Sequence, residues 1–150
     1  MKAMAPIRPT ELHQCRLRLP ANPSTARQAR KEVSDAIAAW NIKIDLDVAV
    51  LLTSELVTNA ITHDGGDDIL LAISCCYCQF RVDVHDTSKS LPVPMTDVPL
   101  DFEAGRGLML VDSLADQWGY YRTATGKAVF FTLTFLPELP QPGDPGRLGL

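Results

Sequence analysis

The sequence predicts an α/β sandwich, with helices on one face of a mixed, mostly antiparallel sheet. Two observations support this prediction. Two long segments carry the apolar repeat of helices, and shorter segments with strand patterns occur as pairs joined by tight turns. The resulting order is strand, helix, helix, strand, strand, loop, helix, strand, strand. In such an order the hairpins supply the sheet, and the helices bury their apolar sides against one face of it.

Each element of the N-terminal half follows from a local pattern. Residues 14–19 alternate polar and apolar side chains and predict a half-buried strand. Residues 24–40 carry one apolar stripe and predict a helix. The next helix begins after Asp45, a residue type favoured at the N-cap, and ends near Asp64, where two glycines follow. Strands are expected at 68–75 and 79–86, joined by a tight turn.

The C-terminal half is expected to contain a loop, a helix and a hairpin. Residues 87–104 include prolines, lack a helical repeat and are long enough for a functional lid. The segment 105–107 (Gly-Arg-Gly) then opens a helix over 108–115, with Leu108, Val111 and Leu114 on its inner side. Residues 119–123 and 127–136 form the closing hairpin.

Composition favours one compact domain, which we place at 12–136. The chain has 150 residues, and 46% of them are hydrophobic. Residues 1–11 are expected to be flexible, and the proline- and glycine-rich segment 137–150 to be a disordered tail. The net charge of −4 argues against binding nucleic acid or a membrane through bulk positive charge. Because no long apolar run or apolar signal core is present, we expect a cytoplasmic protein.

The four cysteines do not have the spacing of a zinc site. Cys75, Cys76 and Cys78 are clustered, but a second pair with two-residue spacing is missing. Vicinal cysteines are also poor disulfide partners. Reduced thiols at the end of a buried hairpin are therefore favoured over a metal site.

The most informative feature is a line of polar residues, Glu55, Asn59 and His63, on the second helix. Glu55 and Asn59 project into its most apolar arc, close to Leu52 and Leu56. Left unpaired there, a carboxylate and a carboxamide would cost on the order of several kcal/mol. They therefore face either a hydrogen-bonding network of the protein or a polar ligand. His63, at the helix end, interacts either with the helix dipole or with an anionic ligand.

Two further segments suit a purine nucleoside triphosphate. Asp86 ends a strand on its apolar face, where a carboxylate can accept a hydrogen bond from an exocyclic amine. The glycines of 105–107 stand at a helix start, where backbone N–H groups and the helix dipole favour phosphate. Taken singly, the aspartate also fits a turn or cap, and the glycines also fit a structural role. The order of all three elements favours a nucleotide site.

Four segments resemble the N, G1, G2 and G3 boxes of the GHKL (histidine-kinase-like) ATPases. They are Glu55-Leu-Val-Thr-Asn-Ala60, Val82-Asp-Val-His-Asp86-Thr-Ser, Gly105-Arg-Gly-Leu108 and Gly126-Lys-Ala-Val-Phe-Phe. The resemblance covers 12–136 and is closest to a stand-alone bacterial branch. That branch comprises the anti-sigma-factor serine/threonine kinases and their small ATP-binding relatives.

The resemblance implies a Bergerat-type ATP-binding fold whose site takes ATP and Mg²⁺. Asn59 would coordinate Mg²⁺, Glu55 would be the catalytic general base, and Asp86 would bind the adenine amine. Residues 87–104 would form the ATP lid. The other nucleotide-binding residues would be His63, Ser88, Gly105, Arg106, Gly107 and Leu108.

Members of this branch bind a sigma factor and phosphorylate a serine or threonine of an anti-anti-sigma protein with a STAS fold. They commonly act as homodimers, and the resemblance implies the same partners here. Two departures bear on phosphotransfer. Ser88 and Ser90 replace the glycines of G1, and Ala128 replaces the threonine of G3, which would remove a hydroxyl from the site. The alternative is a non-catalytic ATP-binding regulator whose lid controls a protein interface; a metabolic enzyme with another ligand is a weaker third hypothesis.

Overall fold

The computed structural model describes residues 12–64, 68–87 and 103–136, with the backbone alone at 62–64 and 103–108. The expected flexible N-terminus and tail lie outside the described residues, and so does the part 88–102 of the expected lid, with Ser88. Residues 103–104, expected to end the lid, belong to a helix. The elements follow the expected order: β1 (His13–Leu19), α1 (Thr25–Ala39), α2 (Leu46–Asp64), β2 (Ile69–Cys76), β3 (Gln79–Asp86), α3 (Glu103–Leu114), β4 (Gln117–Arg122) and β5 (Lys127–Thr134).

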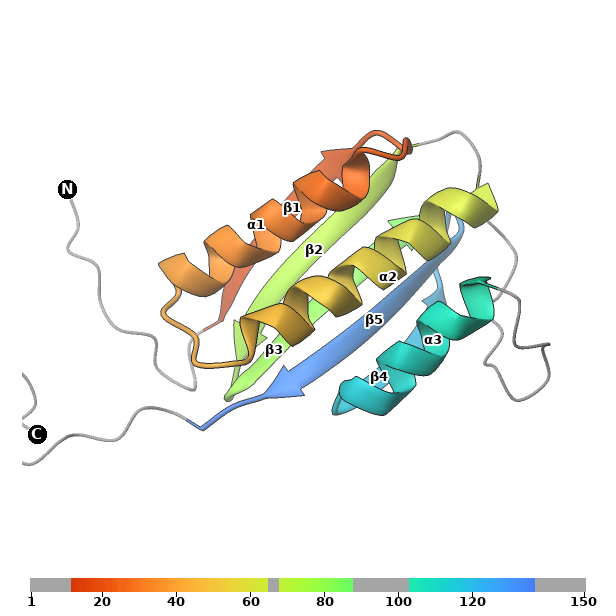
Figure 1. Ribbon diagram of the computed structural model, residues 1–150. Helices are drawn as coiled ribbons and strands as arrows, with labels where there is room; N and C mark the ends of the chain where they lie inside the picture. Colours follow the sequence, from red (N-terminus) through yellow and green to blue (C-terminus); the bar gives the residue numbers. More distant parts are fainter. Residues whose placement is uncertain (1–11, 65–67, 88–102, 137–150) are drawn as a thin grey trace, which may run out of the picture.

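The described strands form one sheet in the order β1-β2-β3-β5-β4. The pairings between these strands are all antiparallel. The sequence predicted a mixed sheet, but no parallel pair occurs among the described strands. α1, α2 and α3 lie over the same face of the sheet, with α2 between the other two (Figure 1). The predicted α/β sandwich with helices on one face is confirmed. No helix within the described ranges is long and apolar enough to cross a membrane.

The core lies between the sheet and α2. Val82 of β3 is the register partner of Phe131 of β5, and both are fully buried on the face toward the helices. Leu52 and Leu56 of α2 belong to the same cluster and are equally buried. Burying an aliphatic side chain of this size contributes about 2 kcal/mol, so this layer holds the helices on the sheet.

Polar contacts fix the start of α2 and its packing on α1. The Asp45 carboxylate accepts a hydrogen bond from the Val48 N–H at 3.1 Å, which confirms the predicted N-cap. The Arg30 guanidinium of α1 donates from Nη1 to Ser54 Oγ of α2 at 2.9 Å. Arg30 therefore joins the two helices, whereas Arg27 is exposed.

α3 differs from the sequence prediction in its start and its inner face. The helix begins at Glu103, so Gly105 and Gly107 lie within its first turns and do not precede it. An acidic first residue suits the positive end of the helix dipole, which helps to offset the cost of about 1 kcal/mol for each helical glycine. Val111 is fully buried as predicted, but Leu114 is 40% exposed and the prediction for it was wrong.

The turn between β2 and β3 has a backbone conformation that its residue types disfavour. Tyr77 and Cys78 both have positive φ, at 54° and 63°, in a two-residue hairpin loop. Such loops favour Asn-Gly because two successive left-handed residues are needed. The cysteines of this hairpin are free thiols, and burial raises the pKa of the Cys75 thiol to about 11. Burial thus holds Cys75 in its protonated, unreactive form.

Replacing Tyr77-Cys78 by Asn-Gly should stabilise the protein. The change relieves left-handed strain of about 1 kcal/mol per residue, although glycine loses part of that gain to entropy in the unfolded chain. Thermal unfolding should show a midpoint several degrees higher. Tyr77→Asn alone is the matched control and should give part of the gain; a lower midpoint for the double variant would contradict this description of the turn.

Candidate nucleotide site

Elements that carry predicted site residues meet at one end of the sheet. The C-terminal half of α2, the first residues of β5 and the start of α3 lie at this end (Figure 1). Asp86, the last residue of β3, is here the register partner of Lys127, the first residue of β5. α2 packs against both β3 and α3, so three separate sequence segments converge.

Asn59 is buried without a hydrogen-bonding partner. It lies in the C-terminal half of α2 and is 5% exposed. Neither its Oδ1 nor its Nδ2 atom forms a hydrogen bond within the described chain. A buried polar group left unpaired costs about 1–3 kcal/mol, and native proteins rarely keep one without a reason. Of the two alternatives that the sequence left open, a network of protein hydrogen bonds is thus not found around Asn59.

The Asn59 carboxamide oxygen fits a Mg²⁺ ligand. A hard cation prefers oxygen donors, and Mg²⁺ commonly takes one or two from protein while water and phosphate supply the rest. Within the described ranges no three His, Cys, Asp or Glu side chains form a cluster of their own that could hold a metal. A metal at Asn59 would therefore depend on the oxygens of its ligand.

Glu55 lies one helical turn before Asn59 and is half-buried. Burial raises the pKa of its carboxyl above the ordinary value. No hydrogen bond or ion pair joins Glu55 to another described residue. A carboxylate with a raised pKa and no protein partner is a better proton acceptor than an ordinary surface glutamate.

Asp86 forms a fully buried ion pair with Lys127. The Lys127 ammonium donates to both carboxylate oxygens, at 3.1 Å to Oδ1 and 2.9 Å to Oδ2. The Asp86 side chain is 0% exposed and the Lys127 side chain is 1% exposed. Removing one partner of a buried ion pair costs about 3–5 kcal/mol. The pair therefore fixes the end of β3 against the start of β5.

Lys127 is the functional candidate that the sequence interpretation missed. The strand pattern indicates its position, because every second residue of a strand lies on the same face. Lys127 therefore shares the apolar face of β5 with Val129 and Phe131. A lysine on an apolar face needs a buried counter-ion, and Asp86 shares that face on the neighbouring strand.

Ala128 does not face the site. It is the register partner of His85, and both lie on the face of the sheet away from the helices. The expectation that an alanine at this position removes a hydroxyl from the site was therefore wrong. The side chain that faces Asp86 is the one directly after Gly126, which is Lys127.

Gly126 leaves room for the end of β3. A Cβ atom at this position would lie 2.1 Å from the Asp86 carbonyl oxygen and 2.6 Å from the Thr87 Cα atom. No rotation of a side chain relieves a clash with backbone, so only glycine fits without moving the strand. Close approach of the two backbones sets the position from which Asp86 projects.

The backbone of α3 changes the expected phosphate contacts. In a helix that begins at Glu103, the N–H groups of the first three residues have no partner within the helix. Gly105 is among them, whereas the N–H groups of Gly107 and Leu108 fall in the regular helical ladder. Arg106 is the fourth residue, the position whose N–H bonds to the cap carbonyl in α1 and α2. The side chains of these residues and of His63 lie outside the described part, so their predicted roles stay predictions.

Comparisons with known proteins agree with this geometry. Residues 19–133 match the family model described as histidine kinase-like ATPase domain. A similar fold occurs in the crystal structure of the RsbU and RsbW domains of Rv1364c from Mycobacterium tuberculosis, with a TM-score of 0.59 and 19% identity. That alignment covers 80% of this chain and 31% of the other, so the likeness concerns the fold of one part of a longer protein. No curated protein matches significantly.

The family match covers the three helices and, of the described strands, β2, β3, β4 and nearly all of β5; it reaches only the last residue of β1. It also includes the buried Asn59 and the Asp86–Lys127 pair, the features that the structure places at one end of the sheet. The chain belongs to the histidine kinase-like ATPase domain family.

Proposed function

We propose that the protein is an ATP- and Mg²⁺-dependent serine/threonine protein kinase of the anti-sigma-factor type. Its substrate would be a serine or threonine on an anti-anti-sigma protein with a STAS fold, and it would also sequester a sigma factor. Family membership implies ATP binding. The observation that carries the proposal is the buried, unpartnered carboxamide of Asn59, one turn after a glutamate whose pKa is raised.

Asn59 and Glu55 have separate roles in this proposal. Asn59 would hold Mg²⁺, and the metal would neutralise charge on the phosphates. Glu55 would accept the proton of the attacking hydroxyl, since burial makes its carboxylate more basic. Placing both on one helix, one turn apart, keeps the base close to the transferred γ-phosphoryl group.

Asp86 would bind the adenine amine, and the ion pair with Lys127 would hold its carboxylate in place. A carboxylate oxygen can accept more than one hydrogen bond, which suits an exocyclic N–H. The N–H group of Gly105, which has no partner within the helix, would meet a phosphate oxygen. We retain His63, Ser88, Arg106, Gly107 and Leu108 as further nucleotide contacts proposed from the sequence.

The partners are proposed from the motifs and from the fold. The resemblance to anti-sigma-factor kinases implies a STAS-domain partner, a sigma factor and a homodimer. The likeness to a structure that contains an RsbW domain supports a regulatory role of this kind. A net charge of −4 gives no support for direct binding to nucleic acid or membrane.

A non-catalytic ATP-binding regulator is the second candidate. Ser88 and Ser90, at positions where the family pattern has glycine, favour it because serine lacks the backbone freedom of glycine. Incubation with Mg²⁺-ATP labelled on the γ-phosphate and candidate STAS-domain proteins separates the two. Transfer of the label supports the kinase; ATP binding without transfer to any partner supports the regulator.

Asn59→Ala should weaken Mg²⁺-ATP binding about tenfold or more, since it removes a ligand of the metal. The unliganded variant should lose no more than about 1 kcal/mol of folding free energy, because the deleted group has no protein partner. Calorimetry and thermal unfolding measure the two effects. Thr58→Ala, on the exposed side of α2, is the matched control. Equal binding by both variants would remove Asn59 from the site.

Glu55→Gln should abolish phosphotransfer while ATP binding survives. It should also stabilise the protein at neutral pH. The folded-state pKa of Glu55 is raised, so folding penalises the ionised form; this penalty grows as pH rises above the unfolded value of about 4.3. The stability difference between variant and wild type should therefore shrink as pH falls toward 4. An active variant would exclude Glu55 as the base.

Lys127→Met should destabilise the fold by about 3–5 kcal/mol at neutral pH, because Asp86 loses its buried counter-ion. Urea unfolding at neutral pH measures this loss. Lys31→Met, which breaks only a surface pair with Asp35, should cost less than about 1 kcal/mol. A Lys127 variant as stable as this control would show that the buried pair is unimportant.

A further inference from the structure

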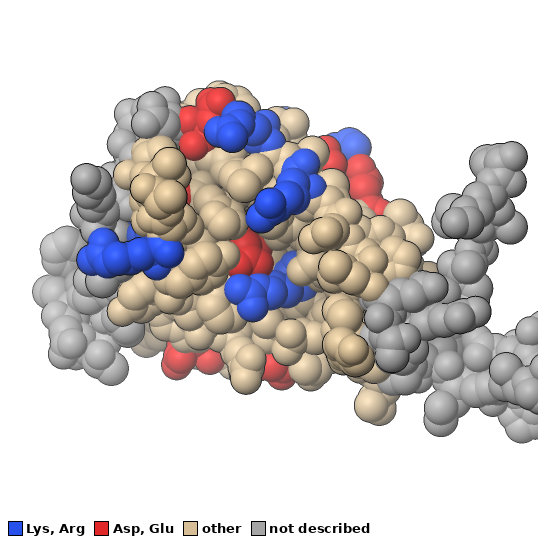
Figure 2. Space-filling view, turned by 180° about the vertical axis from the view of Figure 1, so that it is seen from behind, with Lys and Arg blue, Asp and Glu red and all other residues tan. Residues whose placement is uncertain are grey.

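The face of the sheet away from the helices contains a polar hollow. Figure 2 shows this face, with basic side chains spread over it and an acidic group near its centre. The hollow has a volume of about 130 Å³, compared with the 10–15 Å³ that a single water needs. Ala72 and Ser74 of β2 are small and form its floor, between taller side chains of the neighbouring strands. It lies on the opposite side of the sheet from Asn59 and Asp86.

Asp83, the acidic residue of the hollow, is already neutralised. Arg81 donates from Nε to Oδ1 at 2.8 Å and from Nη2 to Oδ2 at 2.9 Å. The Tyr121 hydroxyl donates to Oδ2 at 2.9 Å. The Arg81 guanidinium also lies over the Phe130 ring, 4.0 Å from its centroid. Three donor atoms, two from Arg81 and one from Tyr121, hold Asp83 in place, so it forms a wall of the hollow with no need of another partner.

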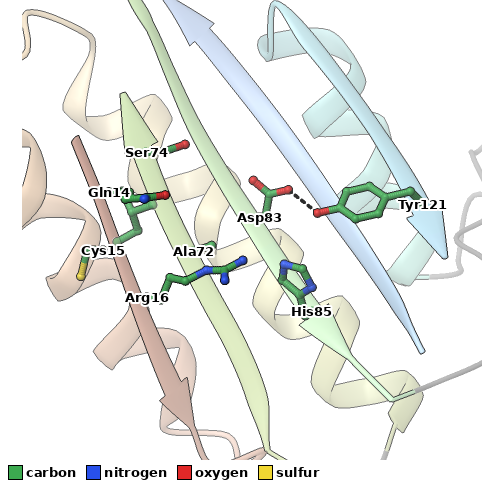
Figure 3. A pocket seen from close by; sticks show the side chains of 9 residues that line it. Gln14, Cys15, Arg16, Ala72, Ser74, Asp83, His85 and Tyr121 are labelled. Carbon is green, nitrogen blue, oxygen red and sulfur yellow. Dashed lines mark hydrogen bonds between the residues drawn. The ribbon is translucent and has the colours of Figure 1, made fainter. Parts of the chain in front are cut away.

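His85 and Arg16 have nitrogen atoms that no described residue binds. The Nε2 atom of His85 is buried without a hydrogen-bonding partner in the described chain. Its ring meets the Tyr121 ring edge-on, with centroids 6.0 Å apart, which fixes the direction of the imidazole. Arg16 extends from β1 across Ala72 toward His85 (Figure 3). Arg16 forms no ion pair with another described residue.

The charge of this face is opposite to that of the chain as a whole. The strand register places three basic side chains on this face, those of Arg16, Arg18 and Arg81. Within the described strands, Asp83 is the one acidic side chain on the same face. The whole chain has a net charge of −4. A local excess of guanidinium groups next to a buried unpaired imidazole is suited to an anion, and guanidinium matches the geometry of carboxylate and phosphate.

We propose that this hollow binds a small oxyanion, a carboxylate or a phosphate group, between the Arg16 guanidinium and His85 Nε2. The Gln14 amide and the Ser74 hydroxyl line the same hollow and add neutral donors. The inference is independent of the proposed kinase activity, because it concerns the other face of the sheet. It assigns a role to a half-buried histidine that the nucleotide site does not use.

Binding should depend on pH. The charged or titratable groups on the same face as His85 are Asp83 and Arg81 of β3, Arg16 of β1 and Tyr121 of β4, and Asp86 acts on it through charge from the other face. In the free protein burial lowers the pKa of His85. An anion beside the ring favours the imidazolium, so the pKa should rise on binding. By linkage, the oxyanion should bind more tightly as pH falls through the range in which His85 takes up its proton.

The test is NMR titration of histidine-labelled, full-length protein with acetate, phosphate and chloride at matched ionic strength. His85→Asn identifies the His85 signal among the three histidines. We expect a saturable shift of that signal with acetate or phosphate, and none with chloride. Acetate and phosphate as separate arms decide which oxyanion the hollow prefers.

Arg16→Gln should weaken this binding about tenfold. Arg18→Gln, on the same strand and the same face, is the matched control and should bind as the wild type does. Thermal unfolding checks that both variants fold. A saturable response that disappears with Arg16 but persists without Arg18 supports the site. Absence of a saturable shift in the wild type, or an equal effect of both variants, would overturn it.

Discussion

The buried ion pair between Asp86 and Lys127 is the constraint on which the candidate site depends. It joins the last residue of β3 to the first residue of β5, where both strands reach the same end of the sheet. The hydrogen bonds from the ammonium to both carboxylate oxygens help to offset the cost of burying two charges. Gly126 completes the arrangement, since its missing Cβ lets the backbone of Asp86 approach. The contact with Lys127 thus sets the position of the Asp86 carboxylate, which we propose as the group that binds adenine.

The two faces of the sheet handle polar groups in different ways. On the helix side, Asn59 is buried with no partner, and Glu55 is desolvated. These groups lower the stability of the free protein, as is common where a protein is organised to bind a ligand. On the open side, Asp83 is satisfied by two donating residues, whereas His85 is not. The unsatisfied polar groups, Asn59 on one face and His85 on the other, are the reason that we propose a ligand on each face.

Much of the fold was predictable because it rests on local patterns. The N-cap at Asp45 and the strand ending at Asp86 were predicted, and the structure has both. The polar positions on α2 were also visible, since Glu55 and Asn59 interrupt an apolar helix. The start of α3 was not, because a favourable first turn outweighed the two glycines.

Long-range relations were harder to predict. Lys127 and Asp86 are 41 residues apart in the sequence. Their pairing depends on the register between β3 and β5, which no local pattern fixes. The same register decides that Ala128 faces away from the site. The hollow beside His85 could not be predicted either, because it requires small side chains on β2 between Arg16 and Asp83.

The central claim is that one end of this sheet binds ATP through a metal held by α2. Calorimetric titration of the wild-type protein with ATP, in Mg²⁺ and again with a chelator, tests it most directly. The account predicts saturable binding of one ATP per chain in Mg²⁺ and much weaker binding once the metal is removed. No saturable binding, or equal affinity with and without Mg²⁺, would contradict it.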